Sequence, residues 1–578
     1  MLIFGWRGSP RRIIAVGLFL IVCVLVRNLK TSHMRELKKF VETEEYSDAA
    51  TQRGSELVVQ RPTAPRESTT GYKRYAEIEP LYRQVESDIH NTRQYSLALL
   101  RQIGAQIPGS PWDLPGLMED VKHRFSVAQH DLWQFRNESG LIEWQREEVE
   151  ALGDQIQHRI RALQNPEDCE SAKKILCNIP VAPKARGTGS QLHHLSYCFL
   201  AAYGTQRTLV INKRETSVMD LDLEAYFLPL SENCAKTTTQ EVAHWPGTED
   251  ALVVQFPDTD RPVPRPNYLP RSVPRDFAER LASFHGDPFA WWMGQFMKYA
   301  MRMNRGFQEA VEKLGARLGF EGPIVGVQVR RTDKLLHDSR LIELEEYMEA
   351  VDDFYNDLEV RGTTVTTRKV YLATDDPQVL KEAKEKFPKH AFVYNEDSVA
   401  SANMKERRSE ANIHNILADV YFLSRSDFLV CGMSSNTPPE RSSPSTHLIG
   451  STTRAATRWR RGSPTRLAEK TLLISPSPFP PSPKKQKLTP PLKHPPLPHL
   501  TLSLLPRPLR DSEIELQRGD RVKEVLRHYS NHRNLHDGFI HGVNQRTRKA
   551  GLYPIYKTVD VLRLADTPPF DAIDRRDK

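Results

Sequence analysis

The stretch VGVQVRRTDK, residues 325–334, decides the fold class. Its three valines alternate with small or polar residues, a pattern that predicts a strand with a buried face. The apolar pattern stops at Arg330 and Arg331, and further polar residues follow. In open α/β sheets, ligands bind outside the carboxyl ends of the strands. The stretch therefore predicts a sheet strand that carries two arginines to a ligand-binding edge.

Similar apolar runs, among them TLVIN, VVQF, VYLAT and FLVC, alternate with helical stretches across residues 165–435. This alternation predicts an α/β domain with a parallel sheet. Polar groups follow two of these runs, and another acid lies on the helix before FLVC. The carboxylates would bind the base or ribose of a sugar nucleotide, and the hydroxyls and loop amides would bind its phosphates. The side chains expected in this site are Asp375, Asp376, Asp419, Ser434 and Ser435.

Each charged pair in this predicted site also has a structural interpretation. Arginine is a rigid five-donor fork, so Arg330 and Arg331 could bind a diphosphate from both sides. Alternatively, they could form ion pairs with Asp333 or a helix carboxylate. Asp375 and Asp376 lack the Asp-x-Asp spacing that binds a divalent metal in many glycosyltransferases, and a carboxylate here could equally cap the helix of DPQVLKEAKEK. We therefore expect no metal ion in the site.

The amino terminus contains a fourteen-residue apolar run at residues 13–26, preceded by basic residues. About twenty residues usually span a bilayer, so a cleaved signal peptide is the alternative. No small-x-small cleavage site follows the run, however. Basic residues before it favour a cytoplasmic tail at residues 1–12. We expect a type II signal anchor, with the rest of the chain in the lumen of the secretory pathway.

Four of the six cysteines form a group whose even number suits two disulfides in an oxidising compartment. Four cysteines allow three pairings, and metal binding is the alternative, although no C-x-x-C spacing is present. Cys23 lies in the predicted anchor, and Cys431 is expected to be unpaired. The four grouped residues are Cys169, Cys177, Cys198 and Cys234.

The net charge of +8 is concentrated in one segment. Residues 436–510 contain thirteen Lys or Arg and two Glu, a net charge of +11. Subtracting this from the total leaves −3 for the rest of the chain. Because the predicted folded part has no basic bias, we exclude nucleic acid as a partner.

The segments on either side of the α/β region differ in composition. Residues 27–76 are polar and predict a flexible stem. Apolar residues three to five apart indicate helices over residues 77–164, which could dimerise as a coiled coil or cover a catalytic core. Residues 436–510 hold sixteen of the 41 prolines and are predicted to be disordered. Residues 511–560 have the rhythm of a small β-barrel resembling part of an SH3 domain, and residues 561–578 form a tail.

Six long motifs resemble the eukaryotic α1,6-fucosyltransferase family. The resemblance runs over residues 77–435 and 511–557. It implies a Golgi enzyme that transfers fucose from GDP-fucose to the innermost GlcNAc of N-glycans, by inversion and without a metal. It also implies a GT-B-like catalytic domain, a helical region that supports a homodimer, and an SH3 domain. The motifs are VGVQVRRTDK, YLATDDP, HNILADVYFLSRSDFLVC, NPEDCESAKKILCN, QLHHLSYCFLAAYGTQRTL and HGDPFAWW.

Carried over by position, Arg330 is the essential diphosphate ligand and Arg331 its neighbour. The family's catalytic glutamate corresponds to Asp338, which can take a proton with one methylene less reach. Gln328 replaces a guanine-contacting histidine and can still form hydrogen bonds. The resemblance also assigns donor binding or catalysis to Asp333, Lys334, Tyr347, Asp375, Asp376, Asp419 and Ser435.

Other implications concern structure. The family pairing would join Cys169 to Cys234 and Cys177 to Cys198. A Pro-rich stretch is weakened as an SH3 ligand by Asn267, which replaces a proline. The prolines of this stretch are Pro264, Pro266 and Pro270.

The segment at residues 436–510 replaces a cysteine, a helix and the opening SH3 strands of the family. Translated intron sequence would explain it, and a real isoform that is poorly folded or inactive is the alternative. The rival to an active enzyme is a lumenal binding or scaffold protein. A third hypothesis is a fucosyltransferase that acts on chitin-type oligosaccharides or on protein.

Overall fold

A computed structural model describes residues 69–106, 113–179, 188–212, 222–237, 241–257, 262–269, 271–331, 342–402, 409–431, 498–501, 514–517, 520–524, 539–554, 558–560 and 562–574. The chain divides into two compact units between Gln145 and Arg146. The predicted signal anchor at residues 13–26 lies outside the described residues. Within the described part, no helix has the length and apolar character needed to span a membrane.

Long helices build the first unit. They are α2 (Thr69–Gln106), α3 (Leu114–Glu138) and the first turns of α4 (Leu141–Gln164). α2 begins at Thr69, so the helical region starts before residue 76, the predicted end of the stem. Fully buried Glu79 forms a hydrogen bond with Arg83, and Arg136 lies 4.0 Å away. Burial raises the pKa of Glu79, although the two arginines oppose this effect.

The predicted apolar stripe of α4 is buried, including Leu152, Ile156 and Ile160. From Arg146 onwards the helix belongs to the second unit. There the Gln164 side chain forms hydrogen bonds with both the backbone N–H and the C=O of Leu209, at 2.9 and 3.1 Å. This part of α4 therefore covers the α/β region, as one of the two sequence hypotheses expected. The coiled coil remains a prediction.

The second unit contains two parallel four-stranded sheets, which confirms the predicted α/β class. The first sheet has the order β2-β1-β4-β3, and α5 packs against β1 and β2. Its elements are β1 (Lys174–Cys177), α5 (Thr188–Gly204), β2 (Thr208–Ile211), β3 (Ala243–His244) and β4 (Val253–Gln255). Two parallel sheets are consistent with the expected GT-B-like arrangement.

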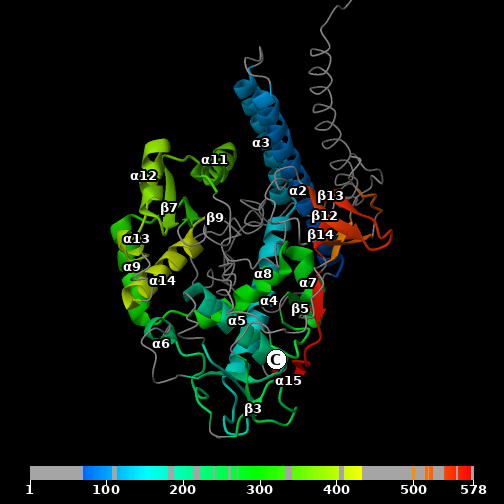
Figure 1. Ribbon diagram of the computed structural model, residues 1–578, viewed down its shortest axis with the longest axis vertical. Coiled ribbons are helices and arrows are strands. Elements are labelled where there is room, and N and C mark those ends of the chain that lie inside the picture. Colours follow the sequence, from blue (N-terminus) through cyan, green and yellow to red (C-terminus); the bar gives the residue numbers. More distant parts are fainter. Residues whose placement is uncertain are drawn as a thin grey trace, which may run out of the picture. The chain divides into compact units, whose positions relative to one another are not determined.

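The second sheet has the order β8-β7-β6-β9. Helices α11 and α12 pack on one face, and α13 and α14 on the other (Figure 1). Gly326 in β6 faces the second group of helices, where an added Cβ would lie 2.7 Å from Ser426 Oγ. The strands are β6 (Ile324–Val329), β7 (Arg368–Thr374), β8 (His390–Val393) and β9 (Phe428–Cys431), and the helices are α11 (Leu344–Val360), α12 (Pro377–Lys386), α13 (Glu396–Ser401) and α14 (Glu410–Arg425).

Several further elements complete the α/β region. They are α6 (Leu223–Tyr226), β5 (Ser272–Pro274), α7 (Arg275–Phe284), α8 (Pro288–Ala300) and α9 (Arg305–Leu318). The HGDPFAWW motif starts α8, where the Asp287 carboxylate caps the helix by accepting from the N–H of Ala290 at 2.9 Å. Trp291 and Trp292 are buried at this point. The motif thus has a packing role.

Both disulfides have the pairing that the resemblance implied. Cys169 joins Cys234, and Cys177 joins Cys198, with Cα–Cα distances of 5.3 and 6.1 Å. Cys431 is the free cysteine among the described residues, as expected. Burial raises the pKa of its thiol to about 11.

The carboxyl-terminal region contains a five-stranded antiparallel sheet of order β13-β12-β11-β10-β14. Its strands are β10 (Pro498–Thr501), β11 (Arg521–Glu524), β12 (Phe539–Asn544), β13 (Ala550–Pro554) and β14 (Thr558–Asp560). β10 corrects the prediction that the whole of residues 436–510 is disordered, because its backbone pairs with both β11 and β14. Apolar residues follow the prolines at this point, so a strand can form. The SH3 assignment remains a prediction.

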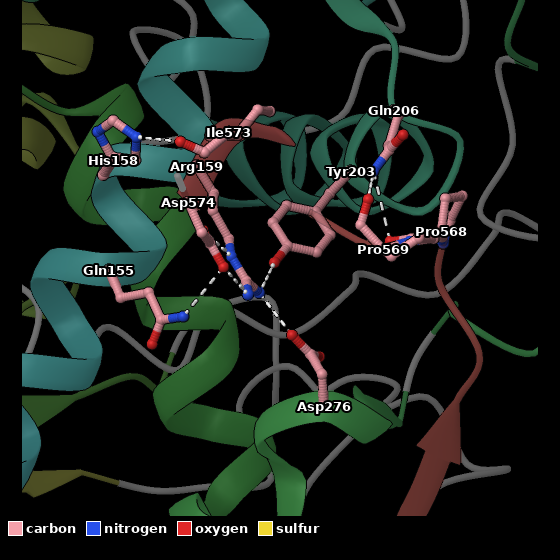
Figure 2. A network of polar contacts seen from close by, with 10 residues as sticks. All are labelled: Gln155, His158, Arg159, Tyr203, Gln206, Asp276, Pro568, Pro569, Ile573 and Asp574. Carbon is pink, nitrogen blue, oxygen red and sulfur yellow. Dashed lines mark hydrogen bonds and ion pairs between the residues drawn. The ribbon is translucent and has the colours of Figure 1, made fainter. Parts of the chain in front are cut away.

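The last described residues are not a loose tail, contrary to the prediction for residues 561–578. β15 (Arg563–Ala565) pairs in parallel with β5, and α15 (Asp571–Asp574) follows it. Figure 2 shows Arg159 of α4 between Asp276 and Asp574, with Nη1–Oδ2 and Nη2–Oδ2 distances of 2.6 and 2.7 Å. Phe570 stacks on Tyr203 with ring centroids 4.5 Å apart. We call residues 562–574 the C-terminal strap.

Candidate active site

The carboxyl ends of three parallel strands meet at one edge of the second sheet. Val329 of β6 pairs with Thr374 of β7, and Gln328 pairs with Cys431 of β9. The chain runs from β6 outwards to β7 and β8, and then returns to the other side of β6 as β9. Such a reversal creates the crevice in which open α/β sheets bind ligands. The sequence prediction that these strand ends adjoin one another is confirmed.

Arg331 does not face the same way as Arg330. Successive side chains of an extended chain point to opposite sides, and Arg331 turns towards α12. Its Nη1 donates to Glu382 Oε2 at 2.6 Å. The sequence analysis considered this ion pair with a helix carboxylate as the alternative. One guanidinium nitrogen of Arg331 is therefore engaged with Glu382, and the binding of a diphosphate by both arginines stays a prediction.

Asp375 supports both arginines. One of its oxygens, Oδ1, accepts from the backbone N–H of Arg331 at 2.9 Å. The other, Oδ2, lies 3.7 Å from Nε of Arg330. Asp375 thus orients the end of β6, and its role in holding a base or ribose stays a prediction.

Asp376 is the N-cap of α12. Its Oδ1 accepts from the backbone N–H of Gln378 at 2.9 Å, and Pro377 occupies the first helical position. This is the capping role that the sequence analysis gave as the alternative to metal binding. The assignment of Asp376 to the donor site stays a prediction.

Asp419 lies on α14, facing β7 and α13. Its carboxylate accepts a hydrogen bond from Tyr371 at 2.6 Å and a short one from Ser398. Burial raises the pKa of Asp419 to about 6, although both hydrogen bonds lower it. Within the described residues, the polar contacts of Asp419 are thus with Tyr371 and Ser398, and its place in the nucleotide site stays a prediction.

Asp419→Asn should change the pH dependence of stability. The folded-state pKa exceeds the unfolded value near 4, so ionisation costs folding free energy as pH rises from about 4 to about 6. At about 1.4 kcal/mol per pKa unit, the full effect is on the order of 3 kcal/mol. Denaturant unfolding at pH 4 and pH 7.5 should therefore show the variant gaining stability relative to wild type at the higher pH. A difference between the proteins that does not vary with pH would contradict the raised pKa.

Of the remaining predicted residues, the structure describes Gln328 and Tyr347. Gln328 lies on β6 and is half-buried, whereas Tyr347 of α11 is 4% exposed and packs in the hydrophobic core beside the sheet. Tyr347 therefore contributes to the core, and its assignment to donor binding or catalysis stays a prediction. Five predicted residues lie outside the described part of the chain: Asp333, Lys334, Asp338, Ser434 and Ser435.

A group of charged residues lies at the start of α11 and on α12. Glu343, Glu345 and Glu382 place carboxylate oxygens within 4.8 Å of one another, so they could hold a cation. However, Lys386 Nζ lies 2.7 Å from Glu345 and 3.0 Å from Glu382, and Arg331 contacts Glu382 as well. These cations already balance much of the negative charge. The signal in the sequence was the spacing of Glu382 and Lys386, one helical turn apart.

The Pro-rich stretch predicted as an SH3 ligand contacts its own unit. Trp245 Nε1 donates to the carbonyl of Pro264 at 2.9 Å, and Asn267 contacts Asp566 of the C-terminal strap at 3.4 Å. Pro270 lies outside the described residues. The SH3-ligand role of Pro264, Pro266 and Pro270 remains a prediction.

Residues 24–437 match the family model described as Alpha-(1,6)-fucosyltransferase N- and catalytic domains. An Alpha-(1,6)-fucosyltransferase of Drosophila melanogaster is 39% identical over 319 residues, covering 55% of this chain and 51% of the relative. One of Caenorhabditis elegans is 34% identical over 291 residues, covering 49% and 51%. The chain thus spans about half the length of each relative. The fucosyltransferase NodZ from Bradyrhizobium has a TM-score of 0.28 and 14% identity, covering 49% of this chain and 92% of NodZ.

Proposed function

Because the chain belongs to the Alpha-(1,6)-fucosyltransferase family, we propose that it transfers fucose from GDP-fucose to a glycan. The proposed acceptor is the innermost GlcNAc of N-glycans, and the new linkage is α1,6. The observation that carries the proposal is the end of β6, where Arg330 of the stretch VGVQVRRTDK lies beside Asp375 at the sheet edge shared by the carboxyl ends of β6, β7 and β9.

The proposed chemistry is a single displacement with inversion. The acceptor 6-hydroxyl oxygen bonds to the anomeric carbon of fucose while the bond from that carbon to the diphosphate breaks. GDP leaves with the electron pair, and a carboxylate takes the hydroxyl proton. Arg330 would stabilise the charge that develops on the diphosphate, because charge-assisted hydrogen bonds from a fixed guanidinium are strong. We assign the base to Asp338 and a supporting charge to Lys334.

The same proposal includes the setting of the reaction. We propose a Golgi membrane protein of type II, anchored by residues 13–26, with its catalytic part in the lumen. The two disulfides agree with an oxidising compartment. We also propose a homodimer, N-glycan glycoproteins as acceptors, and a reaction that needs no metal and no cofactor beyond the GDP-fucose donor.

The test is GDP release by the full-length chain with GDP-fucose and a GlcNAc-terminated biantennary N-glycan. We expect turnover that depends on the acceptor and gives an α1,6-linked product, identified by mass spectrometry and linkage analysis. Activity should persist in EDTA, because the proposed mechanism uses no metal. Turnover only with chitin-type oligosaccharides or with protein would replace the acceptor. No turnover, combined with intact binding of glycoproteins, would favour a scaffold protein.

A further inference from the structure

The ion pair between Arg331 and Glu382 is largely removed from water. The side chains are 13% and 18% exposed, respectively, and the Nη1–Oε2 distance is 2.6 Å. Charge-assisted hydrogen bonds of this kind are stronger and more directional where water is scarce. Glu382 therefore fixes the direction in which the guanidinium of Arg331 points.

Glu382 is itself held by the neighbouring charges. Its second oxygen, Oε1, accepts from Lys386 Nζ at 3.0 Å, and Lys386 also donates to Glu345 on α11 at 2.7 Å. Burial opposes ionisation of Glu382, but the hydrogen bonds from Arg331 and Lys386 lower its pKa overall. Because both carboxylate oxygens are engaged, Glu382 presents a fixed, negatively charged acceptor to Arg331.

Arg331 retains two donor nitrogens that no described residue satisfies. Its Nε and Nη2 are buried and have no hydrogen-bond partner within the described part of the chain. The backbone N–H of the same residue is fixed by Asp375, so the main chain is also held in place. Buried donors without acceptors are unfavourable, and an anion that reaches them would relieve that cost.

We propose that Glu382 is a positioning residue for donor binding. It holds Arg331 through Nη1, which leaves Nε and Nη2 for the diphosphate of the nucleotide. This inference rests on the proposed function. A carboxylate near a diphosphate also repels it, so Glu382 can favour binding only by fixing Arg331 in advance. If Glu382 positions Arg331, removing its charge weakens GDP binding. If it only repels the diphosphate, removing its charge strengthens GDP binding.

The test is Glu382→Gln in the full-length chain, with GDP affinity measured by isothermal titration calorimetry. We expect the Kd for GDP to rise about tenfold and the KM for GDP-fucose to rise with it, with a smaller change in kcat. The matched control is Glu385→Gln on the same helix. Glu385 is exposed and lies 3.9 Å from Lys381, so this change should leave the Kd within about twofold of wild type.

A second variant separates positioning from a general effect on folding. In an Arg331→Met background, Glu382→Gln should have little further effect on the Kd, since the residue it positions is gone. An equal effect in both backgrounds would overturn the inference, as would tighter GDP binding by Glu382→Gln alone. If wild type binds no GDP, the proposed function itself fails. If wild type binds GDP and Glu382→Gln binds it equally well, only the inference about Glu382 fails.

Discussion

Replacing Arg330 with alanine is expected to lower kcat/KM for GDP-fucose by about 1000-fold or more. Loss of a single preorganised donor to developing charge typically costs about 10²–10³ in rate, and a charged, bidentate donor contributes more. Arg330 lies at the end of β6, with Asp375 Oδ2 3.7 Å from its Nε. Steady-state measurement of GDP release with a saturating acceptor glycan checks this expectation.

Two further variants define the effect of Arg330→Ala. Arg330→Lys keeps the charge but loses the planar fork, so it should recover less than about a tenth of wild-type kcat/KM. Arg305→Ala is the matched control, because Arg305 is 93% exposed and pairs only with the helix neighbour Glu309 among the contacts described here. It should leave the kinetics unchanged. If Arg330→Ala stays within tenfold of wild type, the diphosphate does not bind at the end of β6.

The strands could be predicted from the sequence because their signal is local. Alternation in IVGVQV and the apolar runs VYLAT and FLVC reflect burial on the sheet, and the three strands formed as expected. Parallel strands in an α/β unit align their carboxyl ends, so the meeting of Arg330 with Asp375 followed from the strand assignments alone. The strands β1 and β8 were not among those predicted, although each is as long as β9.

The partners of individual side chains could not be predicted in the same way. Arg331 pairs with Glu382, 51 residues further along the chain, and nothing near either residue indicates the other. Asp419 looked like a site residue because it lies close to FLVC in sequence. Its neighbours in space are Tyr371 and Ser398, and both donate hydrogen bonds to its buried carboxylate. The sequence nearby determines on which face of a helix or strand a side chain lies. Tertiary packing determines which residue it contacts.

The contacts of the C-terminal strap could not be predicted from the sequence either. Nothing in its short sequence distinguishes it from a polar tail, yet it supplies β15 to the edge of β5. Arg159 lies between Ile156 and Ile160 on α4, is 5% exposed and binds Asp574 of the strap. A buried arginine needs acceptors, so its position within an apolar stripe was the signal that a distant acid would be required.

Arg159→Met should therefore destabilise the second unit by about 3 kcal/mol. The guanidinium binds Asp574 through two nitrogens, at 2.9 and 2.7 Å, and Asp276 at 2.6 Å (Figure 2). It also lies 4.8 Å from the ring centroid of Phe570. Methionine keeps the bulk of the side chain but leaves two carboxylates without their cation. Thermal unfolding followed by circular dichroism should show a fall in Tm of several degrees.

A shortened chain shows whether this loss passes through the strap. In a chain that ends at residue 561, Asp574 and Phe570 are absent, so Arg159→Met should cost less than half as much as in the full chain. Arg305→Met on the surface serves as the control and should change stability by less than about 0.5 kcal/mol. Equal losses in the long and short chains would mean that Arg159 stabilises α4 and α7 without the strap. A loss confined to the long chain would mean that Arg159 stabilises the second unit through the C-terminal strap.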